Sequence, residues 1–180
     1  MPKKTIKELP SQSIVEIGEA IEDIAHYKED LYEREELKEK NLQLVVFRLD
    51  REWYGLEISK VKEVIRAGKI TYLPSSPEYI AGIVSLRGNI LSVTDLKTIF
   101  SLPHGEPTDK ARIIAIESGV LETGFWVDEV VESIDVPVSK IEPALLSIPA
   151  DGAKYIVGQC KVTDKLIAII NVEKVLEGKD

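Results

Sequence analysis

The sequence predicts a mostly β fold, in which two related small β-barrels share an apolar interface, with an N-terminal helix and short helices added. Three observations predict it. From residue 41 onward, short apolar runs alternate with Gly, Pro, Asn and Asp. Segments of the two halves align with each other without gaps. The first forty residues are highly charged and hold a single glycine. We therefore expect a helical extension over 1–40 and a β domain over 41–180, made of two intertwined subdomains of roughly 41–105 and 106–180.

The extension carries eleven acidic and seven basic residues and has the pattern of an amphipathic helix. Ser13 and Glu16 have the spacing of a capping box. Apolar residues then recur three and four positions apart, at Ile14, Ile17, Ile21, Ile24 and Leu31. Periodicity shows only that an apolar face exists. The helix either packs on its own domain or docks on a partner or a second copy.

Ten segments of the β region have the length and composition of strands, with turn residues between them. They are 42–49, 53–58, 61–65, 83–86, 90–93, 112–116, 123–127, 130–136, 155–162 and 166–170. Short helices are expected over 95–100 and 171–176, because Asp95 and Asn171 are good capping residues. The proline-containing segment 137–150 is expected to be a structured loop in the second half. Strands that follow one another in this way favour barrels over a parallel sheet.

An internal repeat organises these strands. Residues 79–100 align with 155–176, and residues 54–65 align with 123–134. A Tyr-Ile-x-Gly motif begins both members of the first pair. A unit of five short strands buries little apolar surface by itself. The two copies are therefore expected to share a continuous core.

Composition and motifs argue against several functions. The net charge of −8, without a basic stripe, argues against nucleic acid. No apolar run is long enough for a bilayer, and the N-terminus lacks a signal-peptide pattern. The only cysteine, Cys160, is expected in the core and favours a reducing cytoplasm. His26 and His104 lack metal-ligand spacing. With no nucleophile or phosphate-binding motif either, we expect no enzyme, no cofactor and no metal site.

The two copies differ at one hairpin turn, which is Arg87-Gly88-Asn89 in the first and Thr163-Asp164-Lys165 in the second. Both sequences form turns readily, so folding does not require the arginine. Arg87 is then either a solvated turn residue or a recognition residue, a role in which arginine is enriched. A similar choice concerns Val61 and Glu63. They form either a charged edge strand that resists aggregation or a patch for a partner.

Several motifs follow one another in a fixed order along the β region. They are Tyr54-Gly55 with Val61-Lys62-Glu63-Val64, then Leu86-Arg87-Gly88 through Val93-Thr94-Asp95-Leu96, then Gly124-Phe125-Trp126-Val127-Asp128-Glu129-Val130. In this order, and over about 42–177, the chain resembles CheW, the coupling protein family of bacterial chemotaxis. The resemblance implies two five-stranded SH3-like barrels.

The resemblance also implies a function, that of a non-catalytic cytoplasmic adaptor between chemoreceptors and the histidine kinase CheA. The partners would be the cytoplasmic tip of the receptor and the regulatory domain of the kinase, with no membrane insertion. Carried over by position, the receptor side would comprise Val61, Glu63, Arg87, Ile113 and Ile134. The kinase side would comprise Ile58, Val64 and Ile70.

Two departures from the family pattern leave alternatives open. Ser92 stands where the family usually has proline, and the extension 1–40 is longer than the family needs. The chain could therefore be the CheW-like scaffold of a non-flagellar receptor–kinase system. A function of a different class is a small-ligand carrier that uses the cleft between the barrels.

Overall fold

The computed structural model describes residue 25, residues 40–144 and residues 150–178. The helix expected over 1–40 lies almost wholly outside the described residues. The chain divides into two compact units, Met1–Lys40 and Asn41–Asp180, and the second is described here by itself. Among the helices of the described residues, none is long and apolar enough to cross a membrane.

All ten expected strands are present, and most begin or end one to three residues beyond the expected bounds. They are β1 (Asn41–Leu49), β2 (Glu52–Glu57), β3 (Val61–Arg66), β4 (Ile80–Leu86), β5 (Asn89–Asp95), β6 (Arg112–Ser118), β7 (Leu121–Val127), β8 (Glu129–Pro137), β9 (Ile156–Val162) and β10 (Lys165–Ile170). The prediction of a mostly β fold is confirmed.

Short helices complete the unit. They are α2 (Leu96–Phe100), α3 (Ala150–Ala153) and α4 (Val172–Leu176), with 3-10 turns η1 (Ile58–Lys60) and η2 (Val138–Lys140). The Asp95 side chain accepts hydrogen bonds from the first turn of α2, and Asn171 does the same for α4. The caps expected from the sequence are therefore confirmed. In the expected loop 137–150, residues 145–149 lie outside the described residues.

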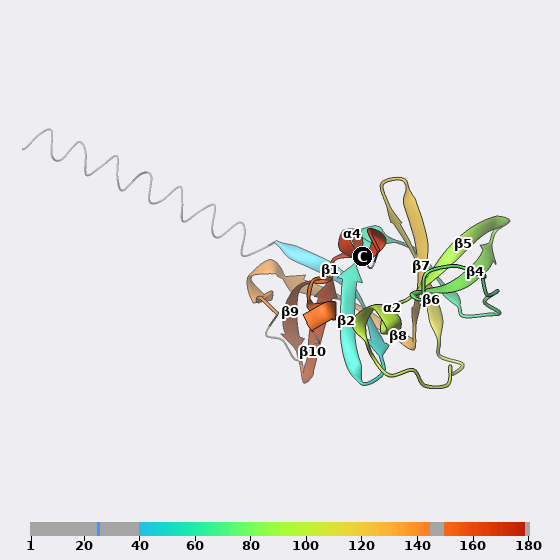
Figure 1. Cartoon of the computed structure of the whole chain (residues 1–180). Coiled ribbons are helices and arrows are strands. Elements are labelled where there is room, and N and C mark those ends of the chain that lie inside the picture. The colour runs from blue at the N-terminus through green and yellow to red at the C-terminus, as the bar shows by residue number, and fades with distance from the viewer. Residues whose placement is uncertain (1–24, 26–39, 145–149, 179–180) are drawn as a thin grey trace, which may run out of the picture. The chain divides into compact units, whose positions relative to one another are not determined.

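The strands form two five-stranded sheets (Figure 1). Sheet A has the order β8-β1-β2-β10-β9, and sheet B has the order β3-β6-β7-β5-β4. In the repeat, β1 to β5 correspond in order to β6 to β10. When each strand is replaced by its counterpart, the order of sheet A becomes that of sheet B. The expected halves, 41–105 and 106–180, therefore each supply strands to both sheets. A sheet is not built from one half, because β3, β4 and β5 cross to β6 and β7, while β8, β9 and β10 cross to β1 and β2.

A close backbone approach explains the glycine of the Tyr-Ile-x-Gly motif. Thr71 and Ile83 exchange two backbone hydrogen bonds of 2.9 Å across Gly82. A Cβ atom on Gly82 would lie 2.2 Å from the carbonyl oxygen of Thr71, and the residue has φ 147°. Gly158 has the equivalent place, where a Cβ atom would lie 2.7 Å from the carbonyl oxygen of Glu142.

The shared core expected between the barrels is present. It contains buried side chains from both sheets and from α2 and α4, among them Phe47, Tyr54, Phe100, Phe125 and Tyr155. The rings of Tyr54 and Phe100 stack at 5.1 Å between centroids. Because these side chains fill the space between the sheets, a ligand carrier that uses an inter-barrel cleft is not supported. Sheet A also encloses a smaller cluster of its own, the sheet A core: Leu44, Val46, Val136, Cys160, Ile167 and Ile169.

We expect Gly82→Ala to lower the unfolding free energy by about 3 kcal/mol or more, because a backbone oxygen cannot move away from the new methyl group. The melting temperature should fall by about 10 °C. Gly68→Ala is the matched control, since no atom lies within 4 Å of a Cβ atom there. Thermal denaturation followed by circular dichroism measures both. Equal melting temperatures for the two variants would contradict this account of the motif.

Candidate partner-binding site

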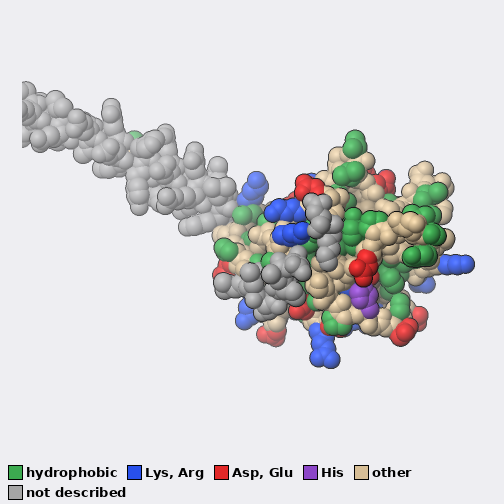
Figure 2. Space-filling view, viewed as in Figure 1, with side chains coloured by type: hydrophobic (Ala, Val, Ile, Leu, Met, Phe, Trp, Pro, Cys, Tyr) green, Lys and Arg blue, Asp and Glu red, His purple; other side chains and the backbone are tan. Residues whose placement is uncertain are grey.

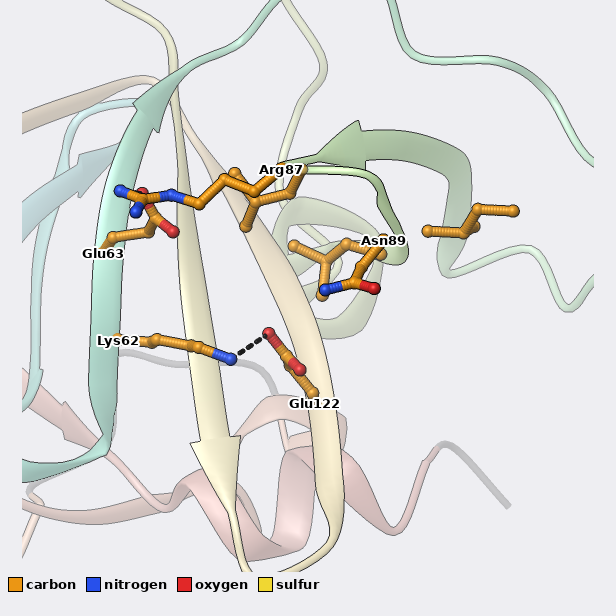
Figure 3. A pocket seen from close by; sticks show the side chains of 8 residues that line it. Lys62, Glu63, Arg87, Asn89 and Glu122 are labelled. Carbon is orange, nitrogen blue, oxygen red and sulfur yellow. Dashed lines mark hydrogen bonds and ion pairs between the residues drawn. The ribbon is translucent and has the colours of Figure 1, made fainter.

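A β-bulge in β3 turns the first residues of the candidate site in different directions. Val61 pairs with Ile116 and Glu63 pairs with Ala115, so Lys62 is the extra residue. Val61 therefore packs against the shared core, whereas Lys62 and Glu63 line a pocket on sheet B (Figure 3). Bulges commonly redirect side chains in this way.

Arg87 stands in a two-residue turn between β4 and β5, because Leu86 pairs with Asn89. Its φ is 50°, and that of Gly88 is 84°. A positive φ costs a residue with a Cβ atom about 1 kcal/mol, and Asn-Gly is the preferred sequence for such turns. Thr163 has φ 54° in the equivalent turn. Local folding therefore does not select arginine at this position.

An ion pair joins Arg87 to Glu63, with 3.1 Å between Nη2 and Oε2. Figure 3 shows the arginine side chain extending from the turn to β3. The two edge strands of sheet B are β3 and β4. The pair connects β3 to the turn that follows β4, so it spans the open end, or mouth, of the sheet B barrel. The Arg87 side chain is 80% exposed. An exposed pair of this kind contributes only about 0–1 kcal/mol.

A second ion pair lies on the same pocket. Lys62 Nζ is 3.1 Å from Glu122 Oε1 and 3.6 Å from Glu117 Oε2. The hydrogen bond to Glu122, followed by the attraction of its charge, raises the pKa of Lys62. When the pKa of a lysine is higher in the folded than in the unfolded state, the charged lysine stabilises the fold. This stabilisation is complete below the unfolded pKa and is lost as pH rises through the folded pKa. Lys62 is therefore charged at neutral pH.

Sheet A has a counterpart of the Glu63 ion pair. Glu132, which aligns with Glu63, lies 3.2 Å from Lys165 Nζ. Lys165 immediately follows the turn that is equivalent to that of Arg87. Both barrel mouths are thus spanned by a cation from the hairpin and a glutamate from the edge strand. The arginine is distinguished by its place inside the turn and by its exposure, since ion pairing alone occurs in both copies.

The structure separates the residues expected on the receptor side. Val61, Glu63 and Arg87 belong to one end of sheet B. Ile113 is fully buried, so it cannot touch a partner and is not retained as a contact residue. It pairs with Trp126 across β6 and β7, and its methyl group reaches Gly124, where a Cβ atom would lie 2.4 Å from it. Ile134 lies on β8 of sheet A and packs against the sheet A core.

The residues expected on the kinase side are partly exposed. Ile58 in η1 is 38% exposed, and Val64 in β3 is 41% exposed. Neighbouring strand residues point to opposite faces, so Val64 and Glu63 face different ways. Ile70 is half-buried beside Gly82. Figure 2 shows hydrophobic side chains gathered over the β4 and β5 side of the face in view.

Sequence reasoning missed Lys62 and Glu122 as parts of the site. The repeat contained the signal, because Lys62 aligns with Val131 and Glu122 aligns with Trp53. Charged residues replace apolar ones at both positions of sheet B.

The structure places the single cysteine and one of the two histidines. Cys160 is buried, as expected, and burial raises the pKa of its thiol. His104 Nε2 contacts Asp95 Oδ2 at 2.7 Å, whereas His26 lies outside the described residues. Across residues 40–144 and 150–178, no group of His, Cys, Asp or Glu side chains could hold a metal ion.

Comparisons with known proteins agree on one family. The family model described as the CheW-like domain matches residues 43–180. The chain is 33% identical to chemotaxis protein CheW of Bacillus subtilis, over 75% of this chain and 86% of that protein. It is 27% identical to CheW of Helicobacter pylori, over 82% and 94%. The crystal structure of the scaffolding protein TtCheW from Thermoanaerobacter tengcongensis superposes with a TM-score of 0.68, at 37% identity, over 74% of this chain and 86% of that one.

We expect Arg87→Asn to leave the melting temperature within a few degrees of the original value. The loss of an exposed ion pair is offset because asparagine tolerates the left-handed conformation better. Thr163→Asn in the equivalent turn is the control and should be neutral or stabilising. Thermal denaturation of both variants checks this. A fall of more than about 10 °C for Arg87→Asn alone would mean that the arginine has a structural role.

Proposed function

Since this chain belongs to the CheW family of chemotaxis scaffold proteins, we propose that it couples chemoreceptors to the histidine kinase CheA. The family is non-catalytic, and the chain is a scaffold and no enzyme. In this proposal it works in the cytoplasm and contacts the receptor tip and the regulatory domain of the kinase at once. The observation that carries the proposal is the exposed Arg87–Glu63 pair on a turn where local folding does not select arginine.

The receptor side is proposed to centre on Glu63 and Arg87, with Val61 behind them. An exposed ion pair supports this assignment, because a partner can replace one of its members at a cost of about 1 kcal/mol. Arginine also offers several donors in a planar fork, which suits carboxylate and amide groups of a partner. Ile134 lies on sheet A, apart from these residues, so it would be a separate contact with the receptor.

The kinase side is proposed to use Ile58 and Val64, together with the half-buried Ile70 beside Gly82. Exposed apolar side chains on and next to an edge strand support this assignment. A second barrel of similar build could pack on such a surface through apolar contacts. Because Val64 and Glu63 face different ways on β3, the two partners would approach the same strand from different sides.

A reconstitution with this chain, a receptor cytoplasmic fragment and CheA tests the proposal. Arg87→Asn should lower receptor capture and receptor-coupled kinase activity about tenfold, a loss of ~1.4 kcal/mol that is typical of a contact residue. Val64→Arg should weaken CheA binding to a similar extent and leave receptor capture unchanged.

Two control variants accompany them. Thr163→Asn makes the same substitution in the equivalent turn of sheet A. Val157→Arg places a charge on an exposed valine of β9. Both should behave as the unmodified chain does. If Arg87→Asn and Val64→Arg each keep full receptor-coupled kinase activity, the proposed surfaces are wrong.

A further inference from the structure

The repeat allows the two barrel mouths to be compared residue by residue. In the parallel pairs between repeat units, Ile169 lies opposite Gly55 in sheet A, and Val93 lies opposite Gly124 in sheet B. These pairs are equivalent in the repeat, so the registers agree. Trp53 of β2 therefore has the same place in sheet A that Glu122 of β7 has in sheet B.

The mouth of sheet A is filled by Trp53. Its half-buried side chain packs against the sheet A core, as do those of Ile134 and Val162. The Lys165 Nζ atom lies 4.5 Å from the centroid of the Trp53 ring, and it also pairs with Glu132. The chain thus closes this barrel with an aromatic ring below a cation.

The mouth of sheet B lacks an aromatic residue at this place. Glu122 replaces the tryptophan, and Asn89 replaces the lysine. The result is a pocket with Leu86 and Leu91 among its lining residues, of which Leu91 is buried. The Lys62–Glu122 and Arg87–Glu63 pairs line it as well (Figure 3).

The charges of this pocket suit an aromatic ring. Each face of an aromatic ring carries partial negative charge and attracts a cation within about 6 Å. Lys62 and Arg87 could each lie over a ring in the pocket, as Lys165 lies over Trp53. Both cations are now held by exposed pairs of about 0–1 kcal/mol, so an entering ring would displace little.

We propose that the sheet B pocket receives an aromatic side chain, of the tryptophan type, presented by a partner protein. The side chain would occupy the place that Trp53 occupies in sheet A. The assignment of the source to a receptor rests on the function proposed above, because Glu63 and Arg87 also form the proposed receptor side. The pocket itself does not depend on that function.

Titration of the full chain with N-acetyl-L-tryptophanamide tests the pocket directly. In methyl NMR spectra, the signals of Leu86 and Leu91 should shift and saturate at millimolar probe. The equivalent residues of sheet A, Val162 and Ile167, should not shift, because Trp53 already fills that mouth. N-acetylglycinamide is the control for the amide groups of the probe. Absence of saturable shifts, or equal shifts in both sheets, would overturn the proposal.

Glu122→Trp fills the pocket with the chain's own side chain. The variant should fold, lose probe binding at least tenfold and lose receptor capture to a similar extent. Lys161→Trp adds an exposed tryptophan on β9 and should change neither probe binding nor receptor capture. Glu122→Ala leaves the pocket open and releases Lys62 from its ion pair, so it should bind the probe more tightly. Loss of probe binding in this variant would contradict the pocket even if the larger side chain prevents folding.

The outcomes separate this inference from the adaptor function. If Arg87→Asn weakens receptor capture but the probe does not bind, the function stands and the aromatic pocket is wrong. If the probe binds but Glu122→Trp keeps full receptor capture, the assignment of the pocket to this partner is overturned.

Discussion

The fold depends on one constraint, which is that a five-stranded sheet of this size encloses little apolar surface of its own. The solution is a shared core, to which both sheets and both C-terminal helices of the repeat contribute. Strand exchange ties the halves together more firmly than surface contact would, because each half must fold to complete both sheets. The aromatic stack of Phe47, Tyr54 and Phe100 lies at this junction. The charged side chains that distinguish the two barrels lie at their outer ends.

The outer ends of the two barrels carry equivalent ion pairs that lie beside different side chains. A glutamate of the edge strand pairs with a cation of the hairpin in each barrel. In sheet A the pair covers Trp53, and the mouth is part of the folded core. In sheet B the pair flanks a pocket with Glu122 in the corresponding place. An internal duplication thus conserves what closes a barrel and frees one copy to change what it exposes.

The sequence allowed the strands, the caps and the shared core to be predicted, because these follow from local patterns. Intertwined subdomains were expected from the sequence, but the strands that pair across the halves could not be predicted, since pairing between β2 and β10 depends on contacts more than a hundred residues apart. Ile113 was placed on the receptor side by the resemblance alone, and the apolar pattern of β6 does not tell which of its faces other elements cover. Lys62 was missed because a bulge, invisible in the strand pattern, turns it toward the pocket.

The two mouths also differ in how readily they can change. Removing Trp53 from its place would expose apolar surface, at about 25 cal/mol for each Å² returned to water. Separating Arg87 from Glu63, or Lys62 from Glu122, returns charged groups to water that they already contact, and the loss is about 0–1 kcal/mol for each pair. The sheet A mouth is therefore fixed with the fold, whereas the sheet B mouth can exchange its internal contacts for those of a partner. A scaffold that must bind without unfolding benefits from this division, since the face proposed to bind is separate from the core that holds the sheets together.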